Sequence, residues 1–290
     1  MKKVLITVLI TAMVVLSAIT LVACEKNDAT FIAEDAIDLL KEDFGIAVTK
    51  GNAQLLAAVN TVIDEWNANG TMQKYKDYYQ AVADEENTGV KATVPDGLKV
   101  EWDFGTATET ITVYTESGFA PYEFIYDGKV IGVDIAIMSQ VALNEGKKID
   151  IKDIMFDTIP TSVSTATGDA VGAAGITINE ERKEQVDFSN PYESSTLVVV
   201  SKDGQYKSVA DLAGKKVGVQ EGTSGDLIIS AAAGAGYKYV GEDDEEKTVV
   251  AAGAEVKQYK QYALALADLK NGRIDAILMD KIPAQLMLKK

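Results

Sequence analysis

Apolar runs rich in Val and Ile alternate with amphipathic stretches from residue 110 to the end of the chain, and this alternation constrains the fold more than any other feature. Such runs are typical of strands that are buried on both faces of a sheet. They are TITVYT (110–115), DAVGAAGI (169–176), TLVVVSK (196–202), KKVGVQ (215–220) and IDAILM (274–279). The intervening segments at 132–146, 224–236 and 262–272 have helical character. Strand and helix in alternation predict an α/β fold with open, mostly parallel sheets.

The composition excludes several classes of function. The chain has 290 residues, of which 47% are hydrophobic, so it can bury the core of one large domain or of two lobes. Its formal net charge is −16, so it lacks the basic surface that nucleic acids and anionic lipids require. The absence of His excludes His-based triads, His metal sites and imidazole acid–base catalysis. We expect neither a cofactor nor a metal.

The amino-terminal residues have the features of an export signal. Lys2 and Lys3 precede an apolar run at 4–23, which is also long enough to span a bilayer as a retained anchor. The stretch LVAC at 21–24 resembles the lipobox of bacterial lipoproteins, in which cleavage before the Cys leaves its thiol to carry lipid. Cys24 is the only Cys in the chain, so no disulfide can form within it. The alternative interpretation is a stray Cys at the end of a transmembrane helix.

Polar residues follow several of the predicted strands. In open α/β sheets, ligands bind in the crevice at the carboxyl ends of the strands. There the sequence places an aromatic loop at 116–124, an Arg within 177–182, a Gly/Thr/Ser turn at 221–226 that enters a helix, and Asp280. Arg and a helix N-terminus suit a carboxylate, whereas Asp280 suits an ammonium group. The set therefore predicts a site for a zwitterion.

Four segments of the sequence carry a family resemblance. They are SGFAPYEFIYDGKVIGVDIAIMSQVA (117–142), GITINEERKEQVDFSNPY (175–192), DLAGKKVGVQEGTSG (211–225) and GRIDAILMDKIPA (272–284). In this order they resemble consecutive blocks of the extracellular solute-binding proteins of polar amino-acid ABC transporters (solute-binding protein family 3), over nearly all of residues 110–290. The resemblance implies a type II periplasmic-binding-protein-like fold, in which two lobes are joined by two hinge strands and close on an amino acid.

The resemblance assigns the carboxylate end of the site to four residues. Arg182 would grip the α-carboxylate, helped by Thr177 and by the amides of Thr223 and Ser224. Taken from the residues alone, Arg182 could instead pair with a neighbouring Glu at the surface, and Thr223 and Ser224 could be helix caps. Capping and anion binding use the same exposed amides, so the last two roles are compatible.

The remaining predicted contacts lie at the ammonium end and along the ligand's side chain. By the resemblance, Asp280 would hold the α-ammonium together with the Gly175 carbonyl, and Phe119 would cover the side chain with Phe156 as the opposing wall. Glu116 stands where relatives often carry an Asp that reads a polar or basic side chain. The alternatives are that Asp280 caps the helix that follows it, that Phe119 belongs to the core, and that Glu116 makes no ligand contact.

The family's final block is displaced in this chain. In relatives, the region of Asp280 is followed by a crossing strand, an amphipathic helix and a short aromatic helix, whereas matching residues lie here at 29–79. They comprise the strand FGIAVTKGN (44–52) and a helix at 53–70 that ends at Asn69-Gly70 and has one apolar face, formed by Leu55, Leu56, Val59, Val62, Ile63 and Trp66. We interpret the chain as a circular permutant. Domain exchange between chains, or excision from a tandem array, would also explain the order.

The permutation predicts the domain organisation. The parts are a lipoprotein signal peptide (1–23), a tether (24–28), part of lobe 2 (29–43), a hinge strand and the terminal helices of lobe 1 (44–80), a permutation linker (81–107) with one short strand around LKVEW (98–102), lobe 1 (108–198), and lobe 2 (199–290), entered through a hinge strand. Termini that lie close together on a surface make such a rearrangement tolerable. FGIAVTK and TLVVVSK would be the two hinge strands.

These observations predict a binding protein and not an enzyme. We expect a lipid-anchored, extracytoplasmic monomer on the bacterial cell membrane that captures a polar amino acid, with a basic or amide side chain, and delivers it to an ABC permease. The alternatives are a dehydratase of prephenate-like cyclic acids on the same fold, for which Glu116 is the candidate general acid, and a ligand-sensing module.

Overall fold

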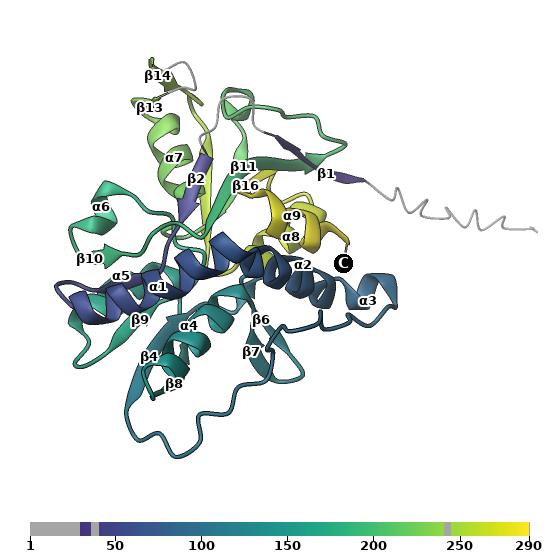
Figure 1. Ribbon diagram of the computed structural model, residues 1–290. Helices are drawn as coiled ribbons and strands as arrows, with labels where there is room; N and C mark the ends of the chain where they lie inside the picture. Colours follow the sequence, from purple (N-terminus) through teal and green to yellow (C-terminus); the bar gives the residue numbers. More distant parts are fainter. Residues whose placement is uncertain (1–29, 36–40, 241–244, 290) are drawn as a thin grey trace, which may run out of the picture.

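Two mixed β-sheets, each covered by helices, form the two lobes of the molecule (Figure 1). The computed structural model describes residues 30–35, 41–240 and 245–289. The predicted signal peptide, the tether and Cys24 lie outside the described residues. Among the helices that are described, none combines the length and the apolarity needed to cross a bilayer.

Lobe 1 is built on a five-stranded sheet in the order β10–β3–β9–β4–β8. Its strands are β3 (Ala47–Thr49), β4 (Thr110–Thr115), β8 (Lys148–Asp153), β9 (Ala170–Gly172) and β10 (Val186–Phe188). A smaller sheet beside it contains β5 (Gly118–Phe119), β6 (Glu123–Tyr126) and β7 (Lys129–Ile131). The helices are α1 (Ala53–Asn69), α2 (Thr71–Ala83), α3 (Glu85–Thr88), α4 (Val133–Asn144), α5 (Ile159–Thr165) and α6 (Glu180–Lys183), with a 3-10 turn at Phe156–Thr158.

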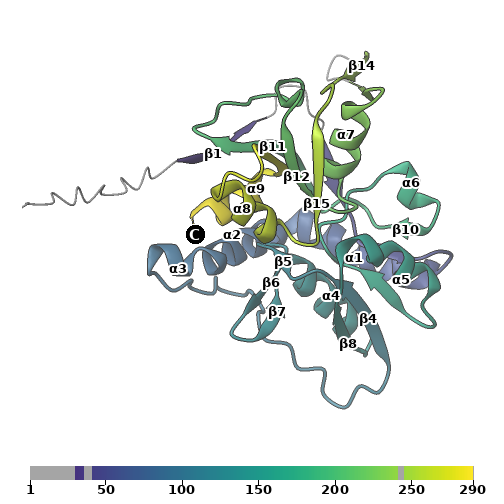
Figure 2. The ribbon, with the colours of Figure 1, turned by 180° about the vertical axis from the view of Figure 1, so that it is seen from behind.

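Lobe 2 is built on a sheet in the order β1–β11–β16–β12–β15, with β2 also paired to β11. Its strands are β1 (Phe31–Asp35), β2 (Lys41–Phe44), β11 (Glu193–Lys202), β12 (Lys216–Gln220), β15 (Glu255–Tyr259) and β16 (Ala276–Asp280). The helices are α7 (Ser224–Ala233), α8 (Tyr262–Lys270) and α9 (Lys281–Lys289), with a 3-10 turn at Ala210–Leu212. A hairpin of β13 (Tyr237–Val240) and β14 (Glu246–Val249) lies at the far end of this lobe (Figure 2).

The chain crosses between the two sheets twice. One crossing runs from β2 into β3 and the other from β10 into β11, and β2 pairs antiparallel with the first residues of β11, so the two crossings lie side by side. Because of these crossings the sheets are mixed, and the prediction of mostly parallel sheets is wrong. Among the described strands, parallel pairing is confined to β4 with β8 and β9, and to β12 with β15 and β16, whereas β1, β2 and β16 run antiparallel to β11.

The part of the displaced block that runs from β3 to α2 packs into lobe 1 of the same chain. β3 lies between β9 and β10 in the sheet, and α1 and α2 pack against α4. The predicted start and end of α1 are confirmed, because the Asn52 side chain accepts a hydrogen bond from the amide of Leu55 and Gly70 ends the helix with φ of 76°. The face of α1 that contains Leu55, Val59, Val62, Ile63 and Trp66 is buried, and Leu56 is half-buried.

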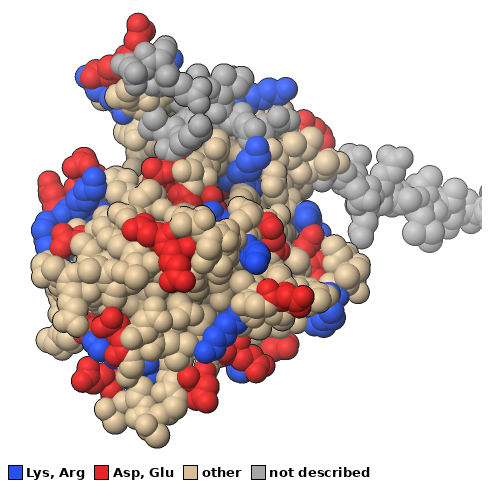
Figure 3. Space-filling view, in the orientation of Figure 1, with Lys and Arg blue, Asp and Glu red and all other residues tan. Residues whose placement is uncertain are grey.

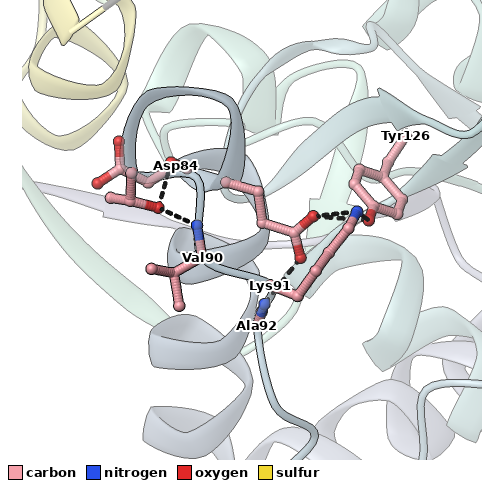
Figure 4. A network of polar contacts seen from close by, with 7 residues as sticks. Asp84, Val90, Lys91, Ala92 and Tyr126 are labelled. Atoms are coloured by element: carbon pink, nitrogen blue, oxygen red, sulfur yellow. Dashed lines mark hydrogen bonds and ion pairs between the residues drawn. The ribbon is translucent and has the colours of Figure 1, made fainter.

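Residues 89–107 run over the surface of lobe 1 as irregular chain. The predicted short strand around LKVEW is wrong, because 98–102 has no strand pairing and packs through Leu98 and Trp102 against the core. The Tyr75 hydroxyl donates to the Lys99 carbonyl at 2.7 Å. At the start of this segment, Lys91 Nζ contacts a Glu85 carboxylate oxygen at 2.6 Å and the Tyr126 hydroxyl at 2.7 Å (Figure 4). The segment therefore contacts lobe 1 near its start and along its middle.

Charged side chains of both signs occur on the face of the molecule that Figure 3 shows. On the face shown in Figure 3, acidic and basic groups of the described residues alternate, and the basic ones do not merge into a continuous area. This distribution agrees with the negative formal net charge of −16.

Candidate functional site

The predicted site residues come together where the two lobes face each other. Contacts between the lobes join Glu116 to Gln220 and Gln261, and Phe119 to Tyr262. Further contacts join the Arg182 side chain to lobe 2 and Ser224 to lobe 1. We call the group of Thr177, Arg182, Thr223, Ser224 and Asp280 the clamp.

Arg182 is buried and is held by backbone carbonyls from both lobes. Its Nη1 donates to the Thr177 carbonyl at 2.7 Å, and its Nη2 donates to the Gly222 carbonyl of lobe 2 at 2.8 Å. The side chain is positioned because Asn179 caps α6 by accepting from the Arg182 amide at 2.8 Å. The alternative of a surface ion pair is wrong, since Arg182 is only 6% exposed and it is Lys183 that pairs with Glu180. A guanidinium with five N–H groups keeps donors for a carboxylate in this arrangement.

Thr223 and Ser224 form the amino terminus of α7 next to this guanidinium. Thr223 is the N-cap, and its Oγ1 accepts from the Asp226 amide at 3.3 Å. The Ser224 hydroxyl donates across the lobes to Thr177 Oγ1 at 2.9 Å. Both predicted roles therefore fit one geometry, because the capped turn presents the same amides that an anion would bind.

Asp280 ends β16 and is only 6% exposed. The Ser195 hydroxyl donates to its Oδ1 at 2.5 Å, and burial raises the pKa of the carboxyl to about 6. Gly175 of lobe 1 has φ of 54°, and a Cβ there would stand 2.7 Å from the Phe119 ring. The ring of Phe119 and the Gly175 backbone are therefore in direct contact, which only a residue without a side chain permits.

Glu42 in β2 was missed from the sequence and borders the clamp. It is 6% exposed and accepts a hydrogen bond from Thr177 Oγ1 at 3.1 Å. Burial, reinforced by the negative charge of Asp280, raises the pKa of Glu42 to about 8. Its only sequence signal is its position two residues before the buried Phe44, which places both on the same face of a strand.

The expected side-chain end of the site is lined by Glu116 and Phe119. Glu116 is 3% exposed, and its two carboxylate oxygens accept from Gln220 Nε2 at 3.0 Å and from Gln261 Nε2 at 2.8 Å. Burial raises the pKa of the Glu116 carboxyl. The Phe119 ring stacks with that of Tyr262 from lobe 2, with centroids 6.5 Å apart. Neither Gln220 nor Gln261 was recognised in the sequence, because a lone Gln after a strand carries no distinctive pattern.

The Phe156 ring packs against the guanidinium of Arg182. The guanidinium carbon of Arg182 is 5.5 Å from the centroid of its ring, which is a cation–π geometry. The ring is half-buried and packs against the small cluster that contains Ile159 and Ile176. Phe156 thus helps to fix Arg182, while a role as the wall opposite Phe119 stays a prediction.

A cavity of about 330 Å³ lies beside the clamp and is bordered by both lobes. Its lining includes Glu42, Thr177, Ser224, Leu227 and Tyr237. At another edge of the interface, Lys260 of lobe 2 forms ion pairs with Glu221 and, at 3.5 Å, with Asp157 of lobe 1. In the part of the chain that the structure describes, no three Asp, Glu, Cys or His side chains are grouped to hold a metal ion.

Two mixed sheets joined by two adjacent crossings, with charged groups between the lobes, define the type II periplasmic-binding-protein-like fold. Residues 111–278 match the family of bacterial extracellular solute-binding proteins, family 3, and the chain belongs to this family.

Known relatives agree with this assignment. The chain is 32% identical to putative ABC transporter arginine-binding protein 2 of Escherichia coli K12, over 60% of its own length and 65% of that protein. It is also 32% identical to an L-cystine-binding protein of the same organism, over 62% of either chain. The chain thus spans somewhat less than two thirds of the length of these two relatives.

Solved structures show the same likeness. An ancestral arginine-binding protein bound to arginine superposes with a TM-score of 0.53 at 36% identity, covering 62% of this chain and 74% of that one. A truncated, arginine-bound ArgBP from T. maritima gives a TM-score of 0.52 at 32% identity, covering 61% and 76%.

Proposed function

We propose that the protein acts outside the cytoplasm, where it binds a polar amino acid between its lobes and delivers it to an ABC permease. The observation that carries this proposal is the clamp. Arg182 from lobe 1 and Asp280 from lobe 2 are both 6% exposed, and the amino terminus of α7 lies beside Arg182. An α-carboxylate and an α-ammonium, one carbon apart, would satisfy these opposite charges together.

Closure follows from the same contacts. The clamp residues belong to different lobes, so one ligand can engage all of them only when the lobes are shut. The hydrogen bonds from Arg182 to Gly222 and from Ser224 to Thr177 already join the lobes. A ligand that adds charge-assisted bonds on both sides shifts the equilibrium further towards the closed form. The paired crossings β2–β3 and β10–β11 are where we place the hinge.

We further propose that the ligand has a basic side chain. Glu116 provides a buried carboxylate on the lobe 1 side, and Phe119 lies close by with an apolar ring. The amides of Gln220 and Gln261 accept or donate equally well, so they can turn from Glu116 to a ligand group. Arginine is named for several relatives, and cystine for another.

The experiment is a thermal-shift screen with the twenty amino acids, cystine and ornithine, followed by calorimetric titration of those that stabilise the protein. We expect arginine, lysine or ornithine to raise Tm most and to bind with micromolar Kd or tighter. A response limited to aliphatic amino acids would contradict the role of Glu116, and no response to any amino acid would contradict the function itself.

An enzyme of the same fold would need Glu116 as a free general acid. Both oxygens of this carboxyl accept hydrogen bonds from Gln amides, which favours a role in ligand binding over a role as a general acid. Turnover of prephenate-like acids that is lost in Glu116→Gln would overturn this conclusion.

We propose that residues 29–80 are the family's terminal part moved to the front of the chain. The proposal is supported by β3, which lies between β9 and β10 although it precedes them by more than a hundred residues, and by the family match, which begins only at residue 111. A rearranged gene that starts at residue 108 and places 29–80 after Lys290 should give a protein with the same fold and ligand. Analytical ultracentrifugation tests exchange between chains, because a monomer that binds ligand excludes it.

The lipid anchor is likewise a proposal, since Cys24 lies outside the described residues. Family members are extracellular by description, and LVAC precedes the first described strand, β1, which pairs with β11 of lobe 2. We therefore expect the lipid to tether lobe 2. Replacing Cys24 with Ser should release the protein from membranes, and mass spectrometry of the wild type should detect acyl groups on Cys24.

A further inference from the structure

We infer that Glu42 is a second acidic group at the ammonium end of the clamp, that Glu42 and Asp280 share one proton in the empty protein, and that the ammonium of a bound amino acid displaces it. The inference rests on the proposed function and extends it to a residue outside the predicted site.

Strand register places the two carboxyls on one face of the lobe 2 sheet. Glu42 of β2 is paired with Ser195 of β11, and Asp280 of β16 is paired with Leu197 on the other edge of the same strand. Paired residues of antiparallel strands point to the same face, and Ser195 and Leu197 are two residues apart and so share it too. The Ser195 hydroxyl, which donates to Asp280, therefore lies between the two acids.

Both acids are enclosed by the closed lobes. Glu42 and Asp280 are each 6% exposed. The Thr177 hydroxyl from lobe 1 donates to Glu42, and the Ser224 hydroxyl at the start of α7 donates to Thr177. These two hydroxyls come from opposite lobes, so Glu42 is positioned by residues of both lobes.

Charges around the pair favour retention of a proton. The groups that interact electrostatically with Glu42 are Asp280 on β16, Arg182 on α6, and the phenols of Tyr237 on β13 and Tyr262 on α8. Glu181 on α6 borders the same cavity but is exposed. On its own strand, Asp43 alternates to the opposite face and is exposed. Two buried carboxylates thus face one guanidinium, and two such acids do not both ionise easily.

The titration of the pair places the proton near neutral pH. The pKa of Glu42 is raised to about 8, with burial as the main cause and Asp280 as the second, and burial raises the pKa of Asp280 to about 6. Both shifts favour retention of a proton by the pair in the empty protein. A bound zwitterion places its carboxylate at Arg182 and its ammonium at the acids, so its positive end replaces the proton as the partner of the second carboxylate.

Calorimetric titration with L-arginine tests this inference. Titrations at pH 7 in buffers with different enthalpies of ionisation measure the protons released on binding. We expect a release that approaches one proton at pH 7, falls as the pH rises to 8, and makes the affinity rise up to tenfold per pH unit between pH 6 and 8. A binding enthalpy that is the same in all buffers would overturn the inference while leaving the proposed function intact.

Variants assign the proton to Glu42. Glu42→Gln should bind L-arginine with most of the release lost and a flatter pH profile. Glu181→Gln, the exposed carboxyl at the same cavity, should keep both. Glu116→Gln removes the other buried acid of the cleft and measures its share of the release. Release that is unchanged in Glu42→Gln overturns the inference, and if that variant does not bind, the pH profile of the wild type decides. Absence of binding by the wild type defeats the proposed function as well.

Discussion

Two pairs of buried acids among the described residues differ in what surrounds them. Glu42 and Asp280 accept hydrogen bonds from hydroxyls, lie near Arg182, and Glu42 borders a cavity. Glu123 and Asp134 are fully buried within lobe 1, where neither oxygen of Glu123 has a hydrogen-bond partner. Burial alone therefore does not mark a binding site.

In the second pair, it is Asp134 that supports the core of lobe 1. Asp134 Oδ2 accepts from the Tyr192 hydroxyl at 2.8 Å and from the Gly175 amide at 3.0 Å, so it fixes the loop that carries Gly175. Burial raises the pKa of Asp134 to about 7 and that of Glu123 well above its usual range. Glu123 therefore keeps its proton to a higher pH than an ordinary Glu and has no hydrogen-bond partner, which costs stability, whereas Glu42 and Asp280 are arranged to receive a charge.

The largest expected effect follows from removing the Arg182 side chain from the clamp. Arg182→Ala leaves a buried ligand carboxylate without its guanidinium, and loss of one member of a buried charge pair costs about 2–5 kcal/mol. We expect Kd for L-arginine to rise roughly 30-fold or more. Lys183→Ala, the exposed neighbour in α6, is the matched control and should bind like the wild type. Equal affinities of the two variants would remove Arg182 from the site.

The next effect is on the core pair. Glu123→Met replaces an acid that has no partner with an apolar side chain of similar length, and we expect the free energy of unfolding to rise by about 1–3 kcal/mol at pH 8. The wild type loses stability as the pH rises above the ordinary Glu range, because its unfolded chain releases the proton while the folded chain retains it. The gain should therefore shrink towards pH 4.

Urea denaturation at pH 5 and pH 8 measures this difference. Glu101→Met, at an exposed position of the linker, is the control and should leave the pH dependence unchanged. A gain that is larger at pH 5 than at pH 8 would contradict the assignment of Glu123 as a retained neutral acid.

The smallest expected effect concerns ion pairs at the surface, which involve neither pair of buried acids. Lys289 of α9 forms an ion pair with Asp84 of lobe 1 at 2.7 Å, whereas Lys91 and Glu85 pair within lobe 1. Exposed pairs contribute about 0.2–1 kcal/mol, so Lys289→Ala should raise Kd no more than about fivefold by weakening closure. Lys91→Ala should leave Kd unchanged because its contact does not depend on closure. If both variants shift Kd alike in titrations at low salt, the pair at Lys289 does not report closure.

Much of the site could be predicted because its residues stand in loops after recognisable strands. The predicted strand TITVYT has the same bounds as β4, and the Gly/Thr/Ser turn leads into α7 as expected. Glu42 could not be found in the same way, because it is buried only when β2 pairs with a strand about 150 residues further along, and four residues are too few for a clear alternation. The mixed sheets escaped prediction for a related reason, since strand direction is set by crossings between lobes and not by local pattern.

The most direct test of the whole account is a crystal structure of the protein grown with L-arginine. We predict density for one ligand between the lobes, with its carboxylate on the Arg182 guanidinium and the α7 amides, its ammonium between Asp280 and Glu42, and its side chain directed to Glu116. A ligand bound elsewhere, or one whose carboxylate lies away from Arg182, would contradict the account.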